Sequence, residues 1–79
     1  MITLEQAKGL QIGQVIYHAI YRNADGTPQC WRVNGKVKTW KRDSNRIRIP
    51  LKRGLYNHGY LDERSLGITC LTEEEALQG

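Results

Sequence analysis

The stretch of residues 31–51, WRVNGKVKTWKRDSNRIRIPL, determines the fold class that we expect for this chain. In its second half the apolar Ile47, Ile49 and Leu51 stand at every other position. This spacing is the period of a strand with one buried face. Pro50 cannot donate a ladder hydrogen bond, so it predicts an edge or the end of that strand. The stretch therefore predicts β structure.

Two turn signals divide the same stretch into strands. Asn34-Gly35 is the preferred dipeptide of a two-residue hairpin turn, because both residues tolerate positive φ angles. It predicts a hairpin between a strand at residues 29–33 and a strand at residues 36–42. Asp43-Ser44-Asn45 predicts a second turn, after which residues 46–51 form a fourth strand that pairs with the third.

The segment before this stretch predicts a short helix and the first strand. Thr3 followed three residues later by Gln6 matches a capping box, so residues 3–9 predict one or two helical turns. Residues 14–22 are rich in Val, Ile and Tyr and are partly apolar on both faces, which predicts a central strand covered on both sides. The turn residues of 23–28 separate it from the second strand.

The segment after the stretch predicts shorter elements. Residues 54–59 are bracketed by glycines and predict a loop or a short strand with a turn. Residues 62–67 predict a single helical or 3₁₀ turn, and residues 68–71 predict a short closing strand. Thr72 with Glu75 matches a second capping box, which predicts a short helix at the end of the sequence.

The number and spacing of these strands predict the architecture. Four or five short strands at intervals of about ten residues are typical of a small sandwich or barrel. The length of 79 residues predicts one domain, residues 1–79. We therefore expect an all-β fold, a partly open SH3-like barrel of about five strands with short terminal helical turns. The alternative is a two-layer α+β domain.

The apolar residues are spread too thinly along the chain to predict a membrane partner. No run of about 18 apolar residues is present, so no transmembrane helix is predicted. The first ten residues lack the basic and apolar regions of a signal peptide. We therefore expect a cytoplasmic protein.

The basic residues are concentrated in the middle third of the chain. The net charge is +4, but residues 31–53 hold nine Lys and Arg against Asp43 alone, a local charge of +8. Residues 1–30 are neutral, and residues 54–79 carry a charge of −4. A concentrated basic segment indicates polyanionic partners, with nucleic acid first among them.

We expect this basic segment to form a nucleic-acid-binding face. Residues two apart share one side of a strand, so Lys38 and Trp40 share a face, and Arg48 faces away from the buried isoleucines. Cations neutralise phosphates with release of counterions, and an indole ring stacks on an unpaired base. The candidate DNA- or RNA-binding residues are Lys36, Lys38, Trp40, Arg42, Arg46, Arg48, Lys52 and Arg53.

The same pattern has an alternative in which no ligand binds. Lysine and arginine on the wet face of a strand also protect a sheet edge, and a register shift of one residue would put Trp40 in the core. A two-residue loop at Asn34-Gly35 would put Trp31 on the basic side, whereas a bulged loop would group Trp31 and Val37 with the isoleucines. We favour the bulged loop, because it gathers the apolar residues on one side.

Metal and catalytic sites are not predicted. A zinc site would have to gather scattered ligands that lack the close spacing of structural zinc sites: His18, Cys30, His58 and Cys70. We expect both cysteines to be reduced, buried thiols. His18 is expected to be a hydrogen-bonded residue of the barrel, and His58 an ordinary polar loop residue. The sequence has no nucleophile motif and no phosphate-binding glycine loop, so we expect no enzymatic activity and no cofactor.

Part of the chain resembles a group of viral proteins. Residues 31–42 and 49–56, together with the closing residues 71–76, look like small uncharacterised proteins of tailed phages and prophages. The resemblance implies a bacterial cytoplasm as the setting. It carries over no known activity and no site residue.

Two other functions remain open on the sequence alone. A protein-interaction module, such as a phage accessory factor that binds an acidic host or phage protein, would use tyrosines to line a groove: Tyr17, Tyr21, Tyr56 and Tyr60. A self-assembling component would pair its Glu-rich C-terminal segment with the basic face of a neighbouring copy. The sequence does not fix the oligomeric state.

Overall fold

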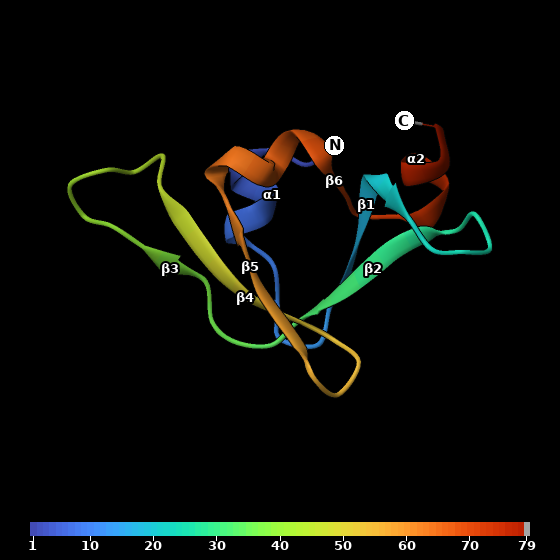
Figure 1. Ribbon diagram of the computed structural model, residues 1–79. Coiled ribbons are helices and arrows are strands. Elements are labelled where there is room, and N and C mark those ends of the chain that lie inside the picture. Colours follow the sequence, from blue (N-terminus) through green and yellow to red (C-terminus); the bar gives the residue numbers. More distant parts are fainter. Residues whose placement is uncertain (79) are drawn as a thin grey trace.

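The computed structural model describes residues 1–78, which form a mostly β fold with short helices. The elements in chain order are α1 (Leu4–Lys8), β1 (Val15–Arg22), β2 (Pro28–Val33), β3 (Lys38–Thr39), β4 (Ile47–Arg53), β5 (Asn57–Asp62), η1 (Glu63–Ile68), β6 (Thr69–Cys70) and α2 (Glu73–Gln78). The strands form one six-stranded antiparallel sheet (Figure 1). The sheet is not closed: its order is β3-β4-β2-β1-β6, and β5 pairs with β4 outside this path.

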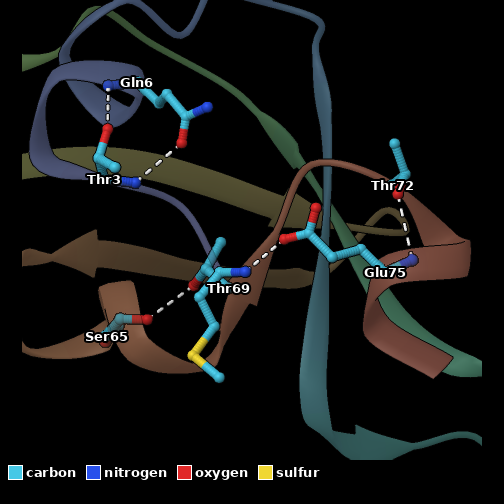
Figure 2. Close-up of polar contacts among 7 residues, drawn as sticks. Thr3, Gln6, Ser65, Thr69, Thr72 and Glu75 are labelled. Atoms are coloured by element: carbon cyan, nitrogen blue, oxygen red, sulfur yellow. Dashed lines mark hydrogen bonds and ion pairs between the residues drawn. The ribbon is translucent and has the colours of Figure 1, made fainter. Parts of the chain in front are cut away.

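The first helix, α1, begins as its sequence predicts. The Gln6 amide donates to Thr3 Oγ1 at 3.1 Å, and the Thr3 amide donates to Gln6 Oε1 at 2.9 Å, so the capping box is complete (Figure 2). These bonds satisfy two backbone donors that would otherwise be unpaired at the helix start. The helix then places Ala7 in the main apolar core with Ile2 and Leu10.

β1 and β2 form an antiparallel pair joined by the predicted turn. The Asn23 amide donates to the Thr27 carbonyl at 2.7 Å, and Gly26 takes a φ of +88°, which glycine adopts without strain. Both predicted strands and their turn are confirmed. The first half of β1 is buried or half-buried, whereas Ile20 in its second half is 63% exposed. The expected cover on both faces is therefore only partial.

The hairpin predicted at Asn34-Gly35 is wrong. β2 pairs with β4, because Val33 lies opposite Leu51 and the Asn34 amide donates to the Pro50 carbonyl at 2.9 Å. Neither Asn34 nor Gly35 takes the positive φ that a two-residue hairpin turn requires. Glycine is needed here for space, because a Cβ atom at position 35 would lie 2.9 Å from Pro50 Cγ.

The third strand is shorter than predicted, but its pairing with the fourth strand is confirmed. We expected it over residues 36–42, and it forms only in β3, where Lys38 lies opposite Arg48 and Thr39 opposite Ile47. β4 pairs with β3 through its first residues and with β2 through its last residues. The chain from β2 to β3 therefore connects two strands that share one edge of β4.

Pro50 lies inside β4, at the point where the neighbouring strand changes from β3 to β2. The strand neither ends at Pro50 nor lies at the edge of the sheet, so the prediction for this residue is wrong. In an antiparallel ladder the nitrogen and carbonyl of one residue face the same edge. The Pro50 carbonyl accepts from Asn34, so the proline nitrogen faces the junction between β3 and β2, where no ladder donor is required.

The loop or short strand predicted after Gly54 is the strand β5, which forms a long hairpin with β4. Six residue pairs run from Arg48 opposite Asp62 to Arg53 opposite Asn57. Gly54 takes a φ of +70° in the turn, a conformation that favours glycine. Figure 1 shows this turn projecting away from α1 and α2.

The segment after β5 leads to β6, the strand that adds to the sheet beside β1. Asp62 caps η1 by accepting the Arg64 amide at 3.0 Å, so the predicted 3₁₀ turn is confirmed. The Thr69 hydroxyl donates to the Ser65 carbonyl at 2.8 Å (Figure 2). β6 pairs with β1, as expected of a closing strand.

The second predicted capping box forms only in part. The Glu75 amide donates to Thr72 Oγ1 at 3.2 Å, and α2 follows as expected (Figure 2). The Glu75 carboxylate contacts the terminal ammonium of Met1 instead of the Thr72 amide. A charged donor makes a stronger hydrogen bond than a neutral amide, which explains why the carboxylate turns away from its own helix.

Two apolar clusters hold the sheet and the helices together. The main cluster contains the predicted Ile47, Ile49 and Leu51, and Trp31 and Val37 pack against it. The favoured grouping of these residues is therefore confirmed, although no bulged hairpin produces it. The smaller cluster lies between α2, β1 and β6 and consists of Ala19, Cys70 and Ala76, with Tyr17 packed against it.

The two cysteines are free thiols that differ in exposure. Cys70 is buried as expected, whereas Cys30 is exposed. The prediction for Cys30 is wrong because it shares the outer side of β2 with Arg32, two residues along. Within residues 1–78, no three His, Cys, Asp or Glu side chains are grouped so that they could hold a metal ion. None of the helices described is long and apolar enough to cross a membrane.

Candidate nucleic-acid interface

The strand register gathers basic side chains on the outer side of the sheet. Lys38 lies opposite Arg48, and Arg32 lies opposite Lys52. Paired residues point to the same side of a sheet, and Arg48 and Lys52 alternate along β4 with buried apolar residues. We name this surface the basic face, and it consists of Arg32, Lys38, Arg46, Arg48 and Lys52 with the rings of Trp40 and Tyr60.

Trp40 lies on the solvent side of the sheet and is half-buried. The guanidinium carbon of Arg46 lies 4.3 Å from the indole centroid, and Lys38 Nζ lies 5.2 Å from it. Cations at these distances are attracted by the negative face of the ring. Trp40 belongs to neither apolar cluster, so the alternative in which it enters the core does not describe this fold.

Tyr60 is a second aromatic side chain on the basic face, and it was not among the predicted nucleic-acid-binding residues. It lies opposite Pro50 and is 60% exposed. The guanidinium carbon of Arg48 lies 4.1 Å from its ring centroid. Tyr60 reaches this face because β5 pairs with β4. The sequence between the two glycines predicted only a loop or a short strand and did not indicate this pairing.

The two rings line one shallow pocket of about 190 Å³. Its lining residues are Trp40, Arg46, Ile47, Arg48, Tyr60, Asp62, Glu63 and Arg64. The lining combines cations and rings with two carboxylates, from Asp62 at the end of β5 and from Glu63 at the start of η1. The pocket can therefore hold a flat group that stacks and also donates hydrogen bonds.

Three predicted residues are not part of the basic face. Lys36 and Arg42 are exposed, in the segments that flank β3. Arg53 is half-buried and donates to Asn23 Oδ1 at 2.5 Å. Arg53 follows Lys52 in β4 and so points to the opposite side of the strand. The structure thus brings together Lys38, Trp40, Arg46 and Arg48, with Lys52 further along the same face.

None of the cations of the basic face forms an ion pair within residues 1–78. The ion pairs found there are Met1 with Glu75 and Arg64 with Asp62, where the distance is 3.4 Å. Arg32, which was not among the predicted binding residues, joins the face through its pairing with Lys52. Unpaired cations that lie close together favour an anionic ligand, since they repel one another in its absence.

The two histidines lie in different surroundings. His58 is exposed and lies opposite Lys52 in the hairpin. His18 is half-buried, with its ring edge-on to Tyr21 at 5.3 Å and to Trp31 at 6.4 Å. Burial lowers the pKa of His18, and the nearby charge of Arg53 lowers it further. Its Nδ1 has no hydrogen-bond partner in residues 1–78, so the expectation of a fully hydrogen-bonded histidine is wrong for this atom.

The four tyrosines proposed to line a peptide groove come from two parts of the sheet. Tyr17 and Tyr21 lie on β1, where Tyr17 packs against the small cluster beside α2 and Tyr21 contacts His18. Tyr56 and Tyr60 belong to the β4–β5 hairpin, and Tyr60 lines a second pocket, of about 80 Å³, together with His18 of β1. Comparisons with protein-family models, with curated proteins and with solved structures find no match for the chain.

Proposed function

We propose that this protein is a non-enzymatic nucleic-acid-binding β protein of phage type that acts in the bacterial cytoplasm. The basic face contacts phosphates, and Trp40 stacks on an unpaired base. The observation that carries the proposal is the position of Trp40, whose ring lies outside both apolar clusters with Arg46 and Lys38 beside it.

The cations supply the binding free energy that does not depend on sequence. Lys and Arg side chains that neutralise phosphates release the counterions condensed on the nucleic acid. If four or five phosphates are engaged, log K falls against log salt with a slope of about −3 for a single strand and about −4 for a duplex. The basic face offers five cations, which matches this number of contacts.

The rings supply a preference for unpaired bases. Stacking of a base on an aromatic side chain contributes about 1–3 kcal/mol and is available only where the base is not already stacked in a duplex. Trp40 and Tyr60 are both accessible on the same face. A single strand can use the cations and the rings together, whereas a duplex uses the cations alone.

We also propose that the sheet is an open variant of the SH3-like barrel. The short strands, their antiparallel pairing and the sharing of β4 among β2, β3 and β5 support this proposal. Small barrels of this kind bind ligands on an exposed sheet surface and need no catalytic groups.

A salt titration tests the nucleic-acid proposal. We would measure the fluorescence anisotropy of a labelled thymidine strand and of a duplex of equal length at about 50 mM and about 200 mM salt. We expect binding that weakens with the slopes given above. Absence of binding to either nucleic acid at the lower salt concentration would refute the proposal.

A matched pair of charge variants locates the interface. Arg48→Gln removes one cation of the basic face and should reduce the magnitude of the salt slope by about 1. Lys8→Gln makes the same change of charge on α1. It should leave the slope unchanged, because Lys8 is not part of the basic face and its ammonium donates to the Ser44 carbonyl at 2.7 Å. Equal effects of both variants would show that net charge, and not the basic face, controls binding.

An acidic protein partner is the alternative, because the same unpaired cations also attract carboxylates. A pull-down from bacterial lysate with and without nuclease separates the two. A partner protein that remains after nuclease treatment favours the alternative, and one that disappears favours the nucleic-acid proposal.

A further inference from the structure

We infer that the pocket between Trp40 and Tyr60 binds one unpaired guanine and that Glu63 selects it. This inference rests on the proposed function and adds a base preference to it. It follows from the size of the pocket, the flat groups along its walls and the presence of Glu63 among its lining residues.

The size of the pocket suits a single base. Its volume of about 190 Å³ is smaller than the roughly 300–1,000 Å³ of pockets that enclose drug-sized ligands. A planar base enters a space of this kind, while its sugar and phosphate remain outside. The basic face continues from the pocket to Lys52 and Arg32, so the phosphates next to the bound base meet cations.

The walls of the pocket are flat and polarised. Arg46 lies over Trp40, and Arg48 lies over Tyr60, so each ring carries a guanidinium. Bases stack on guanidinium planes as well as on aromatic rings. A base that enters therefore finds stacking surfaces among the rings and guanidinium groups of the pocket. A base in a duplex is excluded, because it would first have to leave its own stack.

Glu63 provides the acceptors that distinguish one base from another. The carboxylate of the neighbouring Asp62 is already engaged, since its Oδ1 accepts from the Arg64 amide at 3.0 Å and from the Ser65 hydroxyl at 3.3 Å. The Glu63 carboxylate accepts no hydrogen bond within the described residues 1–78, and Glu63 lines the pocket. Two free acceptor oxygens thus border the stacking surfaces.

Guanine is the base whose edge matches a carboxylate. Its Watson–Crick edge carries two adjacent donors, N1–H and the N2 amino group, which can both bind the two oxygens of one carboxylate. Adenine and cytosine place an acceptor nitrogen beside their amino group, and thymine and uracil flank their one N–H with carbonyl groups. Each of these bases would bring a lone pair against the second oxygen, which costs affinity.

The test uses thymidine strands that differ in one central base. The labelled strands carry guanine, adenine, cytosine, thymine or hypoxanthine, which lacks the N2 amino group of guanine. Wild type should bind the guanine strand about 5-fold to 10-fold more tightly than the others. This is the lower part of the range of discrimination expected for a bidentate base contact, because the pocket is open to water. Glu63→Gln should abolish the preference, and Glu74→Gln on α2 should retain it.

The outcomes separate this inference from the function on which it rests. Equal, salt-dependent binding of all five strands by wild type would overturn the guanine site and leave the nucleic-acid proposal standing. A guanine preference that persists in Glu63→Gln, in protein with an unchanged circular dichroism spectrum, would overturn the role of Glu63. Failure of every strand to bind at low salt would refute the proposed function and this inference with it.

Discussion

Replacement of Gly35 with alanine tests the unexpected pairing of β2 with β4. The new Cβ atom would lie 2.9 Å from Pro50 Cγ and 3.4 Å from Pro50 Cβ. Carbon atoms pack at about 3.5–4.0 Å, so the proline ring or the chain at residue 35 must shift by about 0.6 Å or more. Overpacking of this kind typically costs about 1–3 kcal/mol, and we expect a loss in that range in the free energy of unfolding.

A double-mutant cycle attributes the cost to this contact. Pro50→Ala removes Cγ, so Gly35→Ala should cost at least about 0.5 kcal/mol less in that background than in wild type. Urea unfolding followed by circular dichroism measures all four proteins. Gly67→Ala is the control, because no neighbouring heavy atom lies within 4 Å of a Cβ atom at that position. An equal cost of Gly35→Ala in both backgrounds would refute the explanation by close contact with Pro50. It would show instead that residue 35 needs glycine for its backbone conformation, as the predicted hairpin would require.

Three further changes test the core, the first helix and the half-buried His18. Ile49→Ala should lower the free energy of unfolding by about 2–5 kcal/mol in urea, since Ile49 is fully buried, and a loss well below this range would contradict its position in the core. Thr3→Ala should cost about 0.5–2 kcal/mol through loss of the N-cap acceptor, whereas Thr3→Ser should cost little. The pKa of His18 is lower in the folded protein than in the unfolded chain. As the pH falls below 6.5, the unfolded chain therefore binds more protons than the folded protein, and the free energy of unfolding should decrease. Thermal melts across this range should show the loss in wild type and His58→Gln but not in His18→Gln, and an unchanged pH dependence in His18→Gln would count against the assignment.

Patterns that depend on neighbouring residues predicted their elements well. The capping box at Thr3 and Gln6 needs only one helical turn, and both of its hydrogen bonds form. The alternation of Ile47, Ile49 and Leu51 places all three in the core, because a strand with one buried face has to repeat every two residues. At these positions the tertiary contacts agree with the local signal.

Pairings between distant segments could not be predicted in the same way. Asn34-Gly35 carries the signal of a hairpin, but the pairing of β2 with β4 draws Asn34 to Pro50 and leaves Gly35 in a close approach. The Glu75 carboxylate likewise binds the ammonium of Met1 instead of completing its own capping box. In each case a partner far away in the sequence competes with the local choice.

In the candidate site, too, local patterns predicted some features and pairings between distant segments determined the others. Strand period alone placed Lys38, Trp40 and Arg48 on one face, and the structure brings them together. The same period assigns Arg53 to the opposite side from Lys52, where it binds Asn23. The contribution of β5 to the pocket depended on its pairing with β4, which no local pattern indicated.

The most direct test of the account is the effect of Trp40→Ala on two affinities, one for a single strand and one for a duplex of equal length. Loss of one stacking surface corresponds to about 1–3 kcal/mol, or about a 5-fold to 150-fold loss of affinity. We predict a loss in this range for the single strand and little change for the duplex, with Trp40→Phe close to wild type on both. An equal loss on both nucleic acids, or no loss on the single strand, would contradict the claim that this ring stacks on an unpaired base.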